Sequence, residues 1–272
     1  MSQINYSDVY NKSIEVQDVI NNVLIKKFCE LHNIPLETNV LSMKMEYIAK
    51  AIYFLGVKKK YAAKIFKNEN ETEIDIKGLV PKRSDYPILT RTKIMELLEL
   101  ILDDEVSITK IDEFDKKTEQ EMRELAAIGD KRVGRPVTYF KSFNTYSKVP
   151  VHVLGMELWN QLEYKVFYPS SKGYMFRIKG VNLMSDALEN KFKKAQIDPK
   201  LLANNYIVIP ESEDRVPDYF VIDVDNIVKF AWCDRAEEIL QPFGGRYNSR
   251  KSIVEESSNL SDLFSDMFFS NK

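Results

Sequence analysis

The chain has 272 residues and a formal net charge of −2, and 44% of its residues are hydrophobic, which is enough for a buried core. Its 9 glycines are too few for a collagen-like chain or a glycine-rich phosphate-binding fold. Two distant cysteines suit a reducing cytosol, and neither a signal peptide nor an apolar run of roughly 18 residues is evident, so we expect a soluble cytoplasmic protein.

A helix and a small sheet are expected first. Residues 14–32 carry apolar side chains at helical spacing, and Pro35 should end that helix. Residues 41–66 are rich in Tyr, Ile and Phe and are interrupted at Gly56, which predicts two antiparallel strands. Residues 73–80 alternate between polar and apolar side chains and predict a third strand.

Two long helices should follow the sheet. Residues 83–104 predict a helix, for which Ser84 and Asp85 are candidate caps. Its apolar stripe consists of Ile94, Leu97, Leu98 and Ile101. Residues 107–129 predict a second helix that ends near Gly129.

Shorter elements are expected beyond residue 130. A segment runs from Val151 to Leu162, and residues 164–180 predict a β-hairpin with a Ser-Lys-Gly turn. Residues 223–245 predict a final helix, capped by Asp223 or Asp225. Its expected core residues are Phe230, Trp232, Ile239 and Leu240.

Taken in order, these segments resemble the C-terminal part of family B DNA polymerases, most closely the T-even phage type. The stretch "KKKYA", from Lys58 to Ala62, resembles the family's Lys-Lys-x-Tyr motif at the palm–thumb boundary, and "DIKGL" resembles the strand after it. "RSDYP" before a long helix resembles the start of the thumb. "VHVLGMELWNQL" is similar to the family's His-x-x-Gly segment, and "LQPFGG" to the end of its last thumb helix.

The resemblance implies an α+β fold in three parts. Residues 1–80 would form the C-terminal portion of a palm, with the N-terminal helix and the small antiparallel sheet. Residues 81–246 would form a mostly helical thumb with a β-hairpin. Residues 247–272 would form a flexible apolar tail with a clamp-binding segment.

Several family motifs are missing from the chain. We find no Asp-x-x-Ser-Leu-Tyr-Pro, no Lys-x-x-x-Asn-x-x-Tyr-Gly and no Tyr-Gly-Asp-Thr-Asp. The resemblance therefore implies the C-terminal subunit of a split replicative DNA-directed DNA polymerase, a nucleotidyltransferase. This chain would hold no catalytic residue, metal or cofactor, whereas an N-terminal subunit with exonuclease, palm and fingers would bind Mg²⁺. The alternative is a non-catalytic DNA-binding or clamp-associated replication accessory protein.

The lysine triplet Lys58, Lys59 and Lys60 precedes Tyr61. On a strand, Lys59 and Tyr61 would share one face, and Lys58 and Lys60 the other. Lysines neutralise phosphates without sequence preference, and minor-groove acceptors are nearly the same for every correct base pair. The triplet and Tyr61 are thus candidate contacts to primer–template DNA. The other interpretation is a solvated edge strand whose lysines prevent aggregation.

Charge alternates in blocks along the chain. Residues 50–93 hold 11 Lys and Arg against 5 Asp and Glu, and residues 94–130 hold 4 against 12. Such blocks either build a local basic face or are merely solvated surface. Further DNA-binding candidates near the first thumb helix are Lys77, Lys82, Arg83, Arg91 and Lys93. Weaker candidates are Lys131, Arg132 and Arg135 with Tyr139.

Two other features have a structural and a functional interpretation. Asp223 and Asp225 have the spacing of a two-metal site, but they lie at a helix start, which favours capping. His152 has no neighbouring ligand at helical or hairpin spacing, which favours a buried, hydrogen-bonded imidazole over a base or metal ligand.

Apolar residues return at the C-terminus after a polar stretch. Exposed apolar clusters at a chain end favour a partner, and such a segment can fold into a groove. The resemblance implies a sliding clamp as that partner, although the tail could instead pack on its own domain. The clamp-binding candidates are Leu260, Leu263, Phe264, Met267, Phe268 and Phe269.

Overall fold

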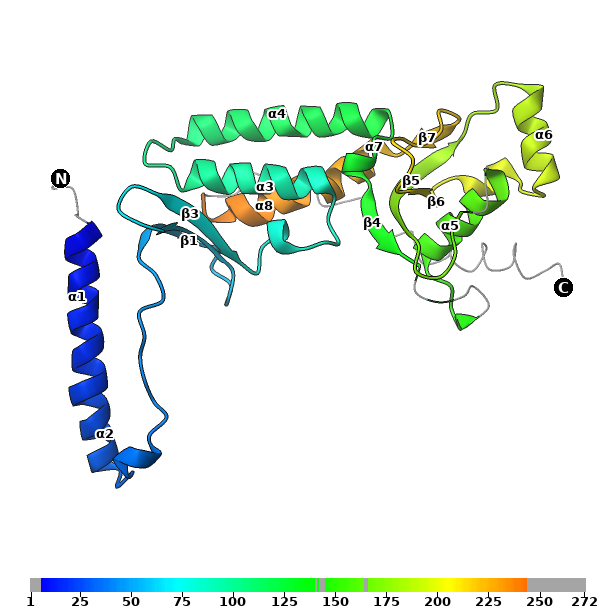
Figure 1. Cartoon of the computed structure of the whole chain (residues 1–272). Helices are drawn as coiled ribbons and strands as arrows, with labels where there is room; N and C mark the ends of the chain where they lie inside the picture. The colour runs from blue at the N-terminus through cyan, green and yellow to red at the C-terminus, as the bar shows by residue number, and fades with distance from the viewer. Residues whose placement is uncertain (1–5, 140, 142–144, 164–165, 244–272) are drawn as a thin grey trace. The chain divides into compact units, whose positions relative to one another are not determined.

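The computed structural model describes residues 6–139, 141, 145–163 and 166–243 (Figure 1). It confirms the α+β class. The chain divides into two compact units. Unit 1 comprises residues 1–54 and 59–77, and unit 2 comprises residues 55–58 and 78–272. No helix in the described ranges is long and apolar enough to cross a membrane.

Unit 1 begins with a long helix that is coloured blue in Figure 1. It consists of α1 (Tyr6–Val19), a π-helical turn (Ile20–Leu24) and α2 (Ile25–Leu31). It ends at the predicted place, where Asn33 has φ +53° and Pro35 follows, but it begins eight residues earlier than predicted. The Asn21 side chain exchanges two 2.7 Å hydrogen bonds with the Met43 backbone, which fixes the returning chain along the helix.

The predicted three strands are confirmed as β1 (Ala49–Phe54), β2 (Tyr61–Phe66) and β3 (Thr72–Lys77). They form an antiparallel sheet in the order β1-β2-β3, with Ala62, Ala63 and Ile76 buried. The rings of Tyr6 and Phe66 lie 5.2 Å apart, so α1 contacts β2.

Unit 2 opens with the two predicted helices, α3 (Ile88–Ile101) and α4 (Ile108–Ala127), which lie side by side. The predicted stripe of α3 is buried. Ser107 caps α4, and Gly129 follows its end with φ +65°. The capping prediction for α3 is wrong: Pro87 occupies the N-cap, and no side chain caps this helix.

A second sheet follows, with the order β4-β5-β6 and β7 paired to β5. The strands are β4 (Arg135–Thr138), β5 (Lys172–Val181), β6 (Tyr206–Pro210) and β7 (Phe220–Ile222). The predicted hairpin over 164–180 is wrong. Residues 166–170 are not a strand, and β5 pairs with three segments that are distant in sequence.

Helices cover this second sheet. The segment after Pro150 is α5 (Val151–Leu162), which packs on β6. A Cβ at Gly155 would lie 3.1 Å from the Tyr206 carbonyl oxygen, so this glycine permits the close approach of α5 to β6. The remaining helices of unit 2 are α6 (Asp186–Lys194), α7 (Val224–Val228) and α8 (Asp234–Leu240), with a π-helical stretch (Lys229–Cys233) between α7 and α8.

The final helix follows the prediction in most respects. The Asp223 side chain accepts from the Asn226 backbone N–H, which makes Asp223 the cap. Trp232, Ile239 and Leu240 are buried as predicted, and the Trp232 Nε1–H donates to Asp115 Oδ1 at 2.8 Å. Phe230 is only partly buried, so its assignment to the core is wrong.

Candidate nucleic-acid interface

The lysine triplet lies in the loop that joins β1 to β2, so the prediction that it lies on a strand is wrong. Phe54 pairs with Tyr61, and residues 55–60 form the loop between them. Gly56 and Lys59 have φ +71° and φ +64°, a left-handed conformation that ends strand pairing. Strict alternation of faces therefore does not apply to the lysines.

Tyr61 and Lys77 are direct partners in the β2–β3 register. Since directly opposed residues of an antiparallel pair point to the same face, their side chains share one face of the sheet. Lys59 and Lys60 precede Tyr61, so four predicted DNA contacts of unit 1 lie at one end of this sheet. We call Lys59, Lys60, Tyr61 and Lys77 the hairpin end. Lys58 comes one residue before it along the chain and is exposed.

Aromatic neighbours support Tyr61. Its ring lies 6.2 Å from that of Phe54, and its hydroxyl is 3.3 Å from the Tyr47 hydroxyl. The hydrogen bond with Tyr61, followed by burial, raises the pKa of Tyr47 to about 12. Tyr47 is therefore neutral at physiological pH and adds no negative charge beside the lysines.

Unit 2 carries a groove of about 610 Å³ between the start of α3, the strands β4 and β5, and the start of α5. Its basic lining consists of Arg91, Arg135, His152 and Lys172, and its carboxylates are Asp85 and Glu211. Arg91 and Lys172 form no ion pair among the described residues, and the buried Arg91 Nε has no hydrogen-bond partner there. This groove can receive an anion.

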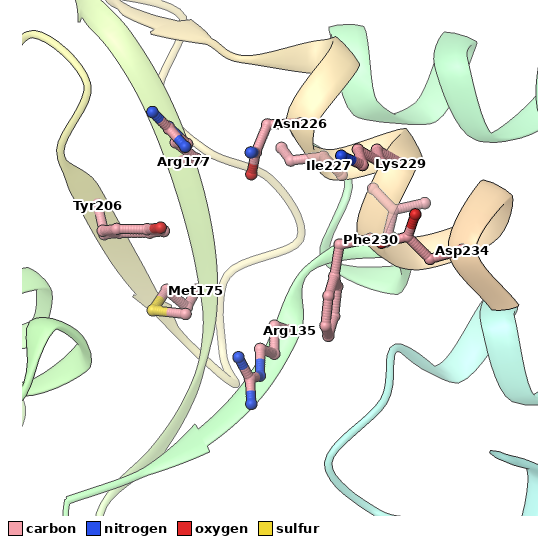
Figure 2. Close-up of a pocket in the computed structure, with 10 residues that line it drawn as sticks. Arg135, Met175, Arg177, Tyr206, Asn226, Ile227, Lys229, Phe230 and Asp234 are labelled. Carbon is pink, nitrogen blue, oxygen red and sulfur yellow. The ribbon is translucent and has the colours of Figure 1, made fainter. Parts of the chain in front are cut away.

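A smaller cleft of about 210 Å³ adjoins the groove and shares Arg135 and Met175 with it (Figure 2). Arg177 and Lys229 also line this cleft, but Arg177 pairs with Asp223 at 3.4 Å, and the carboxylate of Asp234 lines the cleft as well. The Arg135 guanidinium lies 5.0 Å from the centre of the Phe230 ring, which in turn stacks on Tyr86 at 5.7 Å. This cation–π contact holds Arg135 where the two cavities meet.

Other predicted basic residues of unit 2 are neutralised. Arg83 donates two hydrogen bonds to Asp85, at 3.1 and 2.8 Å, which lowers the pKa of that carboxyl and takes it away from the helix cap. Lys93 pairs with Glu96 and Glu121. These pairs leave fewer cations for a ligand than the sequence suggests.

Two of the weaker candidates after α4 are also neutralised by carboxylates. Lys131 pairs with Asp214 at 2.8 Å, and Arg132 pairs with Asp130 at 2.7 Å. Tyr139 is buried and donates to Glu157. Arg135, by contrast, lines both the groove and the cleft.

Two further predictions concern histidine and the acidic pair. His152 is half-buried and hydrogen-bonded to the Thr138 backbone, and burial lowers its pKa. Asp225 pairs with Arg123 at 2.9 Å, while Asp223 caps α7. In the described part of the chain, no group of three or more His, Cys, Asp and Glu side chains could hold a metal ion.

The structure thus brings the predicted residues together in two places. Arg91 and Arg135 line the groove of unit 2. The predicted DNA-binding residues Lys59, Lys60, Tyr61 and Lys77 lie together at the hairpin end of unit 1. Lys82 lies exposed in a 3₁₀ turn outside both. Lys172, Arg177 and Lys229 were not predicted. The basic residues at the two ends of "KGYMFR" are the sequence feature from which Lys172 and Arg177 could have been predicted. The clamp-binding candidates lie outside the described residues.

No protein-family model matches the chain, and no curated protein sequence is similar to it. Among solved structures, it is similar to the family B DNA polymerase from the hyperthermophilic archaeon Pyrobaculum calidifontis, with 19% identity and a TM-score of 0.48. The match covers 86% of this chain and 25% of that polymerase. The chain therefore spans about a quarter of the length of its structural neighbour.

Proposed function

We propose that this chain is the C-terminal subunit of a split family B DNA polymerase. It would hold primer–template duplex and a sliding clamp while a partner chain supplies the metal-binding aspartates, Mg²⁺ and the fingers. The order of motifs along the sequence supports this proposal. The observation that carries it is the hairpin end, where three lysines and a tyrosine gather at one end of a small sheet.

The chemistry of the hairpin end suits a sequence-independent grip on DNA. Ammonium groups bind phosphates regardless of base sequence. A tyrosine hydroxyl beside them can donate to the minor-groove acceptors that all correct base pairs share. The groove of unit 2, with Arg91, Arg135 and Lys172, would add further backbone contacts.

The test compares a Lys59→Ala/Tyr61→Ala double variant of the full chain with a Lys64→Ala control. Lys64 lies on β2 three residues after Tyr61, so it points to the opposite face. Binding to a primer–template duplex is measured by fluorescence anisotropy at several salt concentrations. We expect the double variant to lose about one unit of the salt slope per phosphate contact removed, and the control to keep it.

Primer extension distinguishes this function from that of an accessory protein. The wild-type chain is mixed with the polypeptide of the same source that carries the Tyr-Gly-Asp-Thr-Asp motif. The proposal requires that polypeptide to extend primers only, or far better, with this chain present. If it is fully active alone, a DNA-binding accessory protein becomes the better explanation.

The tail is tested separately. Deleting residues 259–272 should leave distributive synthesis unchanged and abolish the gain in processivity that a loaded clamp provides. Unchanged clamp-dependent processivity would remove the clamp from the proposal without affecting DNA binding.

A further inference from the structure

The N-terminal helix exposes an apolar stripe. Leu24 is 54% exposed and Leu31 is 81% exposed, although both are large and apolar. We call the whole set the N-terminal stripe, and it consists of Val16, Val19, Val23, Leu24, Phe28 and Leu31.

The opposite side of the same helix is already occupied within unit 1. Asn21 bonds to Met43, the Gln17 side chain accepts from the Met45 backbone N–H at 2.7 Å, and Cys29 is fully buried. The helix therefore uses one face to hold the returning chain and leaves its more apolar face uncovered.

Exposed apolar side chains continue beyond the helix. Five more lie between Ile34 and Met43, and Ile52 and Phe54 lie on β1. By contrast, the buried apolar residues among those that the structure describes in unit 1 are Cys29, Ala62, Ala63 and Ile76. A unit of this size with so small a core resembles half of an interface more than a finished domain.

We infer that the N-terminal stripe, with the exposed apolar residues that follow it in the sequence, is the surface on which the polymerase partner chain docks. This inference rests on the proposed function. Thirteen exposed apolar residues fall within a span of 39, which suits an obligate interface, because such interfaces are large and hydrophobic. A second copy that paired helix to helix would leave the residues of 34–43 and β1 uncovered.

A charge in the stripe specifies the partner surface further. Lys27 lies three residues after Leu24 and four before Leu31, so it sits within the stripe. It forms no ion pair with any described residue. The partner surface is therefore an apolar groove that holds a carboxylate opposite Lys27, since a cation buried without a partner is costly.

Two matched pairs of full-length variants test this surface. Leu24→Glu places a charge in the stripe, and Asn22→Glu places it two residues away, off the stripe. Lys27→Glu reverses a charge within the stripe, and Lys26→Glu reverses its neighbour outside it. Binding to the polypeptide that carries Tyr-Gly-Asp-Thr-Asp is measured by titration calorimetry, and duplex binding is measured in parallel as a check of folding.

We expect Leu24→Glu and Lys27→Glu to weaken association of the two chains at least tenfold, and both controls to stay within threefold of wild type. Equal effects in each pair would overturn the inference while leaving the proposed function intact. Failure of the wild-type chains to associate at all would instead count against the proposed function. If the chain alone forms a dimer that Leu24→Glu dissociates, a second copy occupies the stripe and the inference is wrong.

Discussion

Tyr61 and Lys77 are direct cross-strand partners at one end of the first sheet. The two residues are 16 positions apart in the sequence, yet the register places a phenol and an ammonium side by side on one face. Tyr61 follows the lysine loop immediately, and Lys77 ends β3. A ligand that touches the loop can therefore reach Lys77 without rearrangement of the sheet.

Replacing Lys77 with alanine should weaken binding of primer–template duplex. The loss of one phosphate contact should lower the slope of log affinity against log salt by about 0.9. The measurement is duplex affinity between 50 and 200 mM salt, where one contact accounts for a factor of roughly three.

Lys67 provides the control for Lys77. It lies in the turn after β2, at the other end of the same sheet, and it pairs with Glu73 at 3.0 Å. Lys67→Ala should leave the salt slope unchanged. An equal loss of salt slope in both variants would mean that duplex DNA responds to the overall charge of unit 1 and does not bind specifically at the hairpin end.

The elements that the sequence predicted are those whose signals are local. The stripe of α3, the length of α4 and the three strands of unit 1 follow from periodicity and from glycines that end them. Asp223 was a predictable cap because it directly precedes an apolar helix. Each of these features depends on residues within one or two turns of the chain.

The features that the sequence did not predict depend on distant partners. Asp85 is of a residue type that often caps helices, but Arg83 binds its carboxylate, and Pro87 occupies the cap position. The partners of β5 lie up to 44 residues away, as Ile178 and Ile222 show, so a local hairpin was the wrong choice. The groove of unit 2 likewise combines side chains from α3, β4 and β5, which no spacing rule connects.

Arg135 should contribute more to DNA binding than Arg132, although they are three residues apart. Arg135 is exposed at the junction of the groove and the cleft, over the Phe230 ring (Figure 2). Arg132 is held by Asp130 through hydrogen bonds of 2.9 and 2.7 Å. We expect Arg135→Ala to weaken duplex binding severalfold, and Arg132→Ala to have little effect in the same anisotropy assay. The reverse order would exclude the groove as a DNA contact.

Trp232→Phe should destabilise the fold without touching either candidate site. The change removes the N–H donor to Asp115, a carboxylate that is only 7% exposed. Loss of one partner of a buried acceptor costs about 1–3 kcal/mol in free energy of unfolding. Urea denaturation measures this loss. Adding Asp115→Leu to Trp232→Phe should cost less than the sum of the two single changes, because the two side chains share this hydrogen bond. Strict additivity of the two free-energy losses would show that the bond contributes nothing to stability.

Stability should fall on mild acidification partly because of His152. Burial lowers the pKa of this imidazole below 6.5, and the nearby Arg135 guanidinium lowers it further, while the hydrogen bond to Thr138 opposes both. The folded state therefore binds fewer protons than the unfolded state just below pH 6.5. The stability that this group contributes is complete above pH 6.5 and is lost as the pH falls toward the lowered pKa.

Urea midpoints at pH 7.5 and 5.0 should thus differ more for the wild-type protein than for His152→Gln. The carboxylates titrate in both proteins, so a difference between them reports on this imidazole, and identical pH responses would show that His152 accepts a proton in the folded state at no cost.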